Sequence, residues 1–203
     1  MSETVDMLAY EKAAQEQGFE QICGVDEVGW GPLAGPIYSC AVILPKDFDM
    51  AGVTDSKKLS EKKREALYEP LCQRVTFFIG ICTVEEFESM RPGPARWESM
   101  CRAVAGLQIQ ADYALVDGNH MPKLEIPGQC IVKGDSVSAS IGAASIIAKV
   151  ARDRYMMELA KEYPQYGFEL HKGYGTPLHM ERLRQHGPCP AHRSQYIRKV
   201  LAK

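Results

Sequence analysis

The sequence predicts an α/β protein in which about five strands form a sheet flanked by helices, followed by a helical C-terminal section. Two observations carry this prediction. Short runs rich in β-branched residues alternate with longer segments whose apolar residues recur at helical spacing. No internal repeat or low-complexity linker interrupts the alternation, and 203 residues suit one domain, 1–203, with a sizeable core.

The predicted strands are short and apolar. The first ends in the acidic pair Asp26-Glu27, and the second begins directly after a loop rich in glycine and proline. The third is aromatic and β-branched, and the last two each end in an acid. In order, strands are expected at residues 20–27, 37–45, 75–84, 113–118 and 129–135.

The predicted helices are marked by their starts. Ser60 is a suitable N-cap, because its hydroxyl can accept a hydrogen bond from a free N–H group of the first turn. Residues 92–94, Pro-Gly-Pro, are expected to delay the following helix or to rebuild its N-terminus. Small residues at 142–148 favour close packing of the longest helix on the sheet. In order, helices are expected at 59–75, 84–90, 95–107, 136–163 and from about residues 177 and 192.

Composition and charge narrow the protein class. No apolar run reaches the roughly 18 residues that a membrane span needs, and no signal peptide is visible. Seven scattered cysteines indicate reduced thiols in a cytoplasmic protein. Residues 171–203 hold seven Lys or Arg and one acid, a local charge of +6 against a total of −2. This basic section suggests a surface for a polyanion, although a merely solvated helical surface is the alternative.

Acidic residues end three of the predicted strands. Asp26, Asp117 and Asp135 each lie at or just past a strand end, and Glu27 adjoins the first. Strand ends of an open α/β sheet converge on one crevice, so we expect these side chains to meet there. Any one of them could instead cap a turn. Together they would repel one another without a cation, and oxygen ligands select a hard ion such as Mg²⁺ or Mn²⁺.

Such a cluster suits phosphoryl transfer, because divalent ions neutralise charge at the phosphorus. The loop after Glu27 fits this chemistry. Gly29 and Gly31 have no Cβ, so their backbone can come close to a sugar or phosphate.

Five stretches of the sequence closely resemble bacterial ribonuclease HII, in the order and spacing of that family. They are GVDEVGWGPLAGP, TDSKKLSEKKREALYE, LVDG, VKGD with IGAASIIAKVARDR, and YPQYGFELHKGYGTPLHMERLRQHGPCPAHR. The resemblance spans about Cys23 to Val200. It implies a ribonuclease H-like fold and an endonuclease that cleaves the RNA strand of RNA–DNA hybrids and cuts 5′ of ribonucleotides embedded in duplex DNA.

The resemblance also implies roles for particular residues. The four metal-binding acids of the family fall on Asp26, Glu27, Asp117 and Asp135. Asp153 is a competing acid, but it lies far along the predicted long helix and is expected to pair with Arg152 or Arg154 instead. Substrate contacts of the family fall on Gly29, Gly31, Lys57 and Tyr174, with Tyr174 stacking on a sugar and Lys57 contacting phosphate.

Two segments depart from the family pattern. The family loop reads Gly-Arg-Gly, whereas here Trp30 replaces the arginine and its phosphate pairing. Trp30 could stack on a base or sugar, block the groove, or pack aside. Residues 91–96, RPGPAR, replace a helix start whose polar side chains face the nucleic acid in relatives.

The sequence therefore predicts a monomeric, cytoplasmic ribonuclease HII that uses Mg²⁺ or Mn²⁺ and acts on RNA–DNA hybrid and ribonucleotide-containing DNA, with residues 171–203 binding substrate. One alternative is a hybrid-binding protein with weak cleavage because of Trp30. Another is an enzyme that prefers long hybrids. The five histidines show no ligand spacing, and the four in the basic section are expected at surface or capping positions.

Overall fold

The computed structural model describes residues 6–48 and 59–202, so the predicted contact Lys57 lies outside the described residues. A five-stranded mixed sheet, in the order β3-β2-β1-β4-β5, forms the centre. β1 pairs antiparallel with β2 and parallel with β4, so the predicted five-stranded α/β fold is confirmed. The strands are β1 Ile22–Val28, β2 Ile37–Ile43, β3 Thr76–Cys82, β4 Tyr113–Asp117 and β5 Gly128–Ile131.

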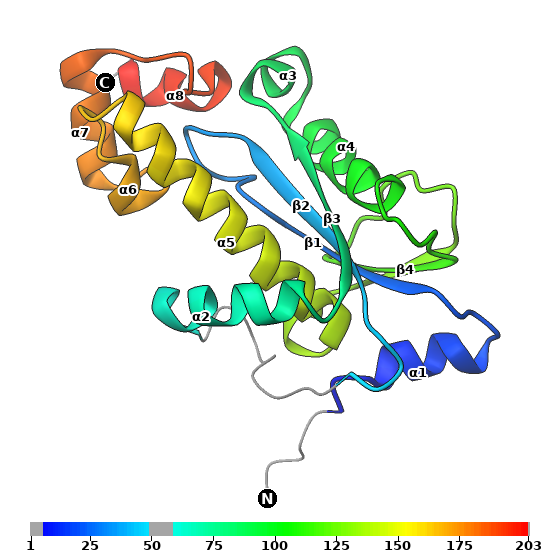
Figure 1. Cartoon of the computed structure of the whole chain (residues 1–203). Coiled ribbons are helices and arrows are strands. Elements are labelled where there is room, and N and C mark those ends of the chain that lie inside the picture. The colour runs from blue at the N-terminus through cyan, green and yellow to red at the C-terminus, as the bar shows by residue number, and fades with distance from the viewer. Residues whose placement is uncertain (1–5, 49–58, 203) are drawn as a thin grey trace, which may run out of the picture.

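Helices cover both faces of this sheet (Figure 1). α5 packs on β1 and β2 from one face, and α4 packs on β3 and β2 from the other. α2 lies on α5, and the C-terminal helices α6, α7 and α8 gather at one end of α5 (Figure 1). The helices are α1 Ala9–Glu16, α2 Glu61–Cys72, α3 Val84–Ser89, α4 Pro92–Ala105, α5 Ala139–Glu162, α6 Phe168–His171, α7 Pro177–His186 and α8 Ser194–Leu201. None of the described helices is long and apolar enough to cross a membrane.

Small residues let α5 approach the sheet closely. A Cβ added to Gly24 of β1 would lie 2.2 Å from the backbone carbon of Ser140, so only glycine fits there. The predicted small-residue stretch 142–148 is buried within α5. This contact fixes α5 over β1 and β2 and sets the position of every α5 side chain that reaches the sheet ends.

The start of α4 decides between the two outcomes predicted for residues 92–94, a delayed helix or a rebuilt N-terminus. Pro92 and Pro94 do not delay the helix, which begins at Pro92. Proline is tolerated in a first turn because the N–H groups there have no acceptor within the helix.

The predicted Ser60 cap of α2 is confirmed, since its hydroxyl accepts from the Lys63 backbone N–H at 3.3 Å.

Candidate active site

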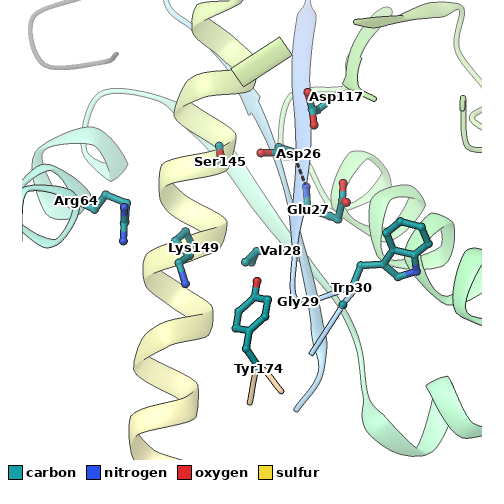
Figure 2. Close-up of a pocket in the computed structure, with 11 residues that line it drawn as sticks. Asp26, Glu27, Val28, Gly29, Trp30, Arg64, Asp117, Ser145, Lys149 and Tyr174 are labelled. Carbon is teal, nitrogen blue, oxygen red and sulfur yellow. Dashed lines mark hydrogen bonds between the residues drawn. The ribbon is translucent and has the colours of Figure 1, made fainter. Parts of the chain in front are cut away.

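A pocket of about 370 Å³ opens between the end of β1 and the middle of α5 (Figure 2). It brings together three of the four predicted acids and the predicted glycine loop, Trp30 and Tyr174. It is lined by Asp26, Glu27, Val28, Gly29, Trp30, Gly31, Arg64, Asp117, Ser145, Lys149 and Tyr174.

Strand pairing explains why the acids meet. β1 and β4 run parallel with Val25 opposite Val116. Asp26 and Asp117 are the next residues of these strands, so they lie at the same edge of the sheet. Neighbouring side chains of a strand point to opposite faces. Asp26 therefore points toward α5 and Glu27 toward α4 (Figure 2). Oδ1 of Asp26 also accepts from the Glu27 backbone N–H at 2.7 Å.

Asp135 occupies a different position from the one predicted. β5 ends at Ile131, and Asp135 lies beyond it in the short 3-10 turn Gly134–Ser136. The Gly134 N–H donates to Oδ1 of Asp117 at 2.7 Å, which holds this turn against the β4 end. The Asp135 side chain is fully buried and, unlike the other three acids, is not among the described residues that line the pocket.

The acids strongly perturb one another. Burial, followed by the charges of Glu27 and Asp117, raises the pKa of Asp26 well above its ordinary value. Burial also raises the pKa of Glu27, although the neighbouring Arg96 opposes this. Crowded carboxylates of this kind are stabilised by a cation, and their all-oxygen donor set suits a hard divalent ion.

The present side-chain orientations do not form a finished metal site. Within residues 6–48 and 59–202, no three His, Cys, Asp or Glu side chains converge closely enough to ligate one ion. Each pocket acid is held by another group. Asp26 accepts from the Glu27 N–H, Asp117 accepts from the Gly134 N–H, and Glu27 accepts from Arg96.

Arg96 is a site residue that sequence reasoning did not single out. It projects from the second turn of α4 and donates from Nη2 to Oε2 of Glu27 at 2.9 Å. Its guanidinium lies over the Trp30 ring, 5.1 Å from the centroid. The Trp30 indole N–H in turn donates to the Pro92 carbonyl at 3.1 Å. The two departures from the family pattern, at 30 and at 91–96, are thus one packed unit.

Two basic side chains lie across the pocket from the acids. Arg64 projects from α2 and Lys149 from α5, and both line the pocket beside Tyr174 (Figure 2). The Lys149 ammonium lies 6.0 Å from the Tyr174 ring centroid. Sequence reasoning missed both residues. The available signal was helical spacing, because Ser145 and Lys149 are four residues apart and so share a helix face.

Asp153 has a structural role, as expected, but with another partner. Its Oδ1 accepts from Lys149 Nζ at 2.7 Å, one helical turn away. Arg154 instead pairs with Glu65 and Glu69 of α2.

A buried arginine holds the glycine loop after β1 in place through hydrogen bonds to its carbonyl groups. Arg193 is fully buried, and its guanidinium donates to the carbonyl oxygens of Gly29, Trp30, Pro32 and Gly35 at 2.5 to 3.1 Å. Burial, with the nearby charge of Arg152 as a lesser cause, lowers the pKa of Arg193 to about 9. This cation was counted in the basic section 171–203, yet it faces the interior.

Arg152 of α5 is a second buried clamp. It donates to the carbonyl oxygens of Pro36, Ala34 and Lys172 at 3.0 to 3.2 Å, which ties the loop to the segment before Tyr174. A Cβ on Gly29, where φ is +89°, would lie 2.1 Å from its Nε. At Gly31, by contrast, a Cβ would meet nothing within 4 Å. Gly29 is thus required by the fold, whereas Gly31 keeps its backbone open.

Three histidines of the C-terminal section are buried, so the expected surface position is wrong for them, although their ring nitrogens pair with nearby backbone groups. His171 and His179 stack with ring centroids 4.3 Å apart, and Nε2 of His179 lies 3.0 Å from Nε2 of His192. Burial lowers the pKa of His179 and of His192 to about 4. These rings pack against Phe168 and Tyr166 as part of the core behind the loop.

Comparisons with known proteins agree with this geometry. The family described as Ribonuclease HII matches residues 23–199. Ribonuclease HII of Bacillus cereus strain ZK / E33L is 47% identical over 202 residues, covering 98% of this chain and 78% of the relative. That of Neisseria meningitidis serogroup C is 48% identical over 184 residues, covering 89% and 95%. The crystal structure of ribonuclease H2 from Pyrococcus horikoshii superposes with a TM-score of 0.76 at 26% identity, covering 90% of this chain and 98% of that one.

These matches favour an enzyme and give no support to the alternative of a hybrid-binding protein with weak cleavage because of Trp30. The chain therefore belongs to the ribonuclease HII family, metal-dependent endonucleases that hydrolyse the RNA strand of RNA–DNA hybrids.

Proposed function

We propose that this ribonuclease HII uses Asp26, Glu27, Asp117 and Asp135 to hold Mg²⁺ or Mn²⁺ and cuts 5′ of ribonucleotides embedded in duplex DNA, as well as within RNA–DNA hybrids. The observation that carries this proposal is one pocket with three carboxylates on one side and two basic side chains on the other. The divalent ions would supply Lewis acidity at the phosphodiester.

Other residues around the pocket would bind and position the substrate. Arg64 and Lys149 are placed to bind backbone phosphates, and charge-assisted bonds of this kind are among the stronger ones. Tyr174 is 41% exposed and offers a ring face to a sugar. The open backbone at Gly31 can approach the ribose 2′-hydroxyl. Arg193 and Arg152 would keep that backbone in place, because they fix the carbonyl groups around it.

The proposal also covers which substrates are cut, the oligomeric state and the cellular compartment. Single ribonucleotides in duplex DNA and long RNA–DNA hybrids are both assigned as substrates, with residues 171–203 contributing phosphate contacts outside the pocket. We further propose that the protein works as a monomer in the cytoplasm. Light scattering of the purified protein, alone and with a hybrid, tests the monomer.

Two variants and one control test the acid assignment. Asp26→Asn and Asp135→Asn should each abolish cleavage of a duplex with one ribonucleotide and of an all-RNA hybrid. Asp47→Asn, which neutralises an exposed acid outside the pocket, should cleave like the wild type. Asp26→Asn should be at least as resistant to urea as the wild type, because it removes a buried repelling charge. Full activity of Asp135→Asn would remove that residue from the metal set, whereas full activity of Asp26→Asn would refute the site.

A further inference from the structure

Arg96 gives the acid pair a cation that belongs to the protein itself. Its guanidinium bonds Glu27 directly, at 2.9 Å, and both side chains are only 12% exposed. Nη2 also lies 3.4 Å from the Asp117 carbonyl oxygen, so one guanidinium reaches the ends of both β1 and β4. Arg96 thus contacts two of the elements that carry the predicted metal ligands.

The surroundings of Arg96 are shaped to hold it there. Gly118, with φ +106°, leaves room for the guanidinium, because a Cβ at this position would lie 3.1 Å from Nη2. The Trp30 ring covers the guanidinium from the loop, and Trp30 is anchored to Pro92 in the first turn of α4. A residue enclosed in this way is not a mobile surface arginine that happens to meet an acid.

We propose that Arg96 is a positioning residue that serves as an internal counterion of the acid cluster and competes with a divalent ion for Glu27. This inference rests on the proposed function, because it takes Glu27 as a metal ligand. Oε2 of Glu27 cannot keep its full bond to a guanidinium and also bind an ion without bringing two cations close together. Arg96 therefore weakens ion binding while it holds the Glu27 carboxylate and the Trp30 loop in place.

The proposal predicts that removing the Arg96 charge has opposite effects on the affinity for the metal and on the rate of cleavage. Loss of the Arg96 charge should tighten binding of the metal alone, on the order of tenfold, because a nearby positive charge has been removed. The same loss should slow cleavage at saturating metal, since Glu27 and Trp30 lose the contact that orients them. A merely structural ion pair predicts no tightening.

Isothermal titration of the purified full chain with Mn²⁺ alone tests this inference. Arg96→Gln should lower the Kd for Mn²⁺ about tenfold, whereas Arg96→Lys, which keeps the charge, should stay near the wild-type value. Lys123→Gln is the matched control, because it removes one exposed positive charge on the loop beside the far end of α4. Its Kd should change less than twofold. Thermal melts confirm that each variant is folded.

A Glu27→Gln variant separates this inference from the proposed function. If Glu27→Gln weakens Mn²⁺ binding and folded Arg96→Gln leaves it unchanged or weaker, the counterion role is refuted while the metal site stands. If Glu27→Gln leaves the Kd unchanged, Glu27 is not a ligand and both proposals are overturned.

Discussion

Trp30→Arg replaces the ring that packs on the Arg96 guanidinium with a second positive charge. From the sequence, restoring the arginine of the family should restore a phosphate contact worth about 1.5–3 kcal/mol, and so speed cleavage about ten- to a hundredfold. In the structure the Trp30 ring lies 5.1 Å from the Arg96 guanidinium, so an arginine at 30 would bring two like charges together. We therefore expect Trp30→Arg alone to be no faster than the wild type.

The contacts of Trp30 set the size of the effect on stability. Trp30→Arg loses a cation–π contact of about 0.5–1 kcal/mol and an indole hydrogen bond to Pro92 of about 0.5–1.5 kcal/mol. The expected cost is about 1–2.5 kcal/mol. In an Arg96→Gln background the cation–π contact is already absent, and the repulsion cannot arise. The cost of Trp30→Arg should there fall by at least about 0.5–1 kcal/mol.

A double-mutant cycle measures both quantities. Urea unfolding of the wild type, the two single variants and the double variant gives the coupling free energy. Values of kcat/KM on a duplex with one ribonucleotide give the functional counterpart. We expect Trp30→Arg to slow the wild type but to speed the Arg96→Gln protein, because the new guanidinium is then free to meet phosphate.

Two outcomes would refute this reasoning. If the stability effects of the two substitutions add within about 0.5 kcal/mol, Trp30 and Arg96 are not coupled. If the Trp30→Arg variant has a higher kcat/KM than the wild type while Arg96 is present, Trp30 has simply replaced a phosphate contact that arginine would make. That is the outcome that the sequence alone predicts.

Four further predictions concern other residues of the pocket and of the C-terminal section. Lys149→Gln or Arg64→Gln should raise the Kd for a hybrid about three- to tenfold in fluorescence anisotropy without changing Mn²⁺ affinity; an unchanged Kd removes them from the phosphate contacts. Lowering the pH from 7 to 5 should lower Tm by roughly 5 °C or more, because His179 and His192 stay neutral when folded but take up protons when unfolded. A flat Tm over this window contradicts that linkage. Arg182→Gln with Arg184→Gln should reduce the log–log salt slope of hybrid binding by up to about two. Arg193→Gln should instead lower stability by about 3 kcal/mol or more, measured by urea unfolding, because it leaves several buried carbonyl groups unpaired.

Sequence reasoning succeeded where local pattern and topology agree. Asp26 and Asp117 could be brought together because each ends a short apolar run, and parallel strands place such ends at one sheet edge. Asp135 was harder to place. Its run of apolar residues continues to Val132, but the strand stops at Ile131 and the left-handed Lys133 turns the chain away. Nothing in the local pattern marks that turn, because lysine rarely adopts φ of +58°.

Contacts between distant segments explain what the sequence could not show. Trp30 and Arg96 are 66 positions apart, and each looked like a separate departure from the family pattern. Only the packing of α4 against the β1 end makes them neighbours, so no periodicity or local motif records their relation. For the same reason Arg64 and Lys149 looked like ordinary helix cations, since only the packing of α2 on α5 brings them to the same pocket.

Arg193 shows why local charge is an unreliable guide to a binding surface. In the sequence it counts toward the +6 of residues 171–203 in the same way as Arg182 or Arg184. Its side chain is nevertheless buried and binds the carbonyl groups of the loop that carries Gly31, whereas Arg182 and Arg184 are exposed. We therefore expect the C-terminal section to contribute to substrate binding in two physically different ways. Its outer cations can attract phosphate over a distance set by salt, whereas its inner arginine fixes the backbone that a ribose would meet, and salt has little effect on a contact so deeply buried.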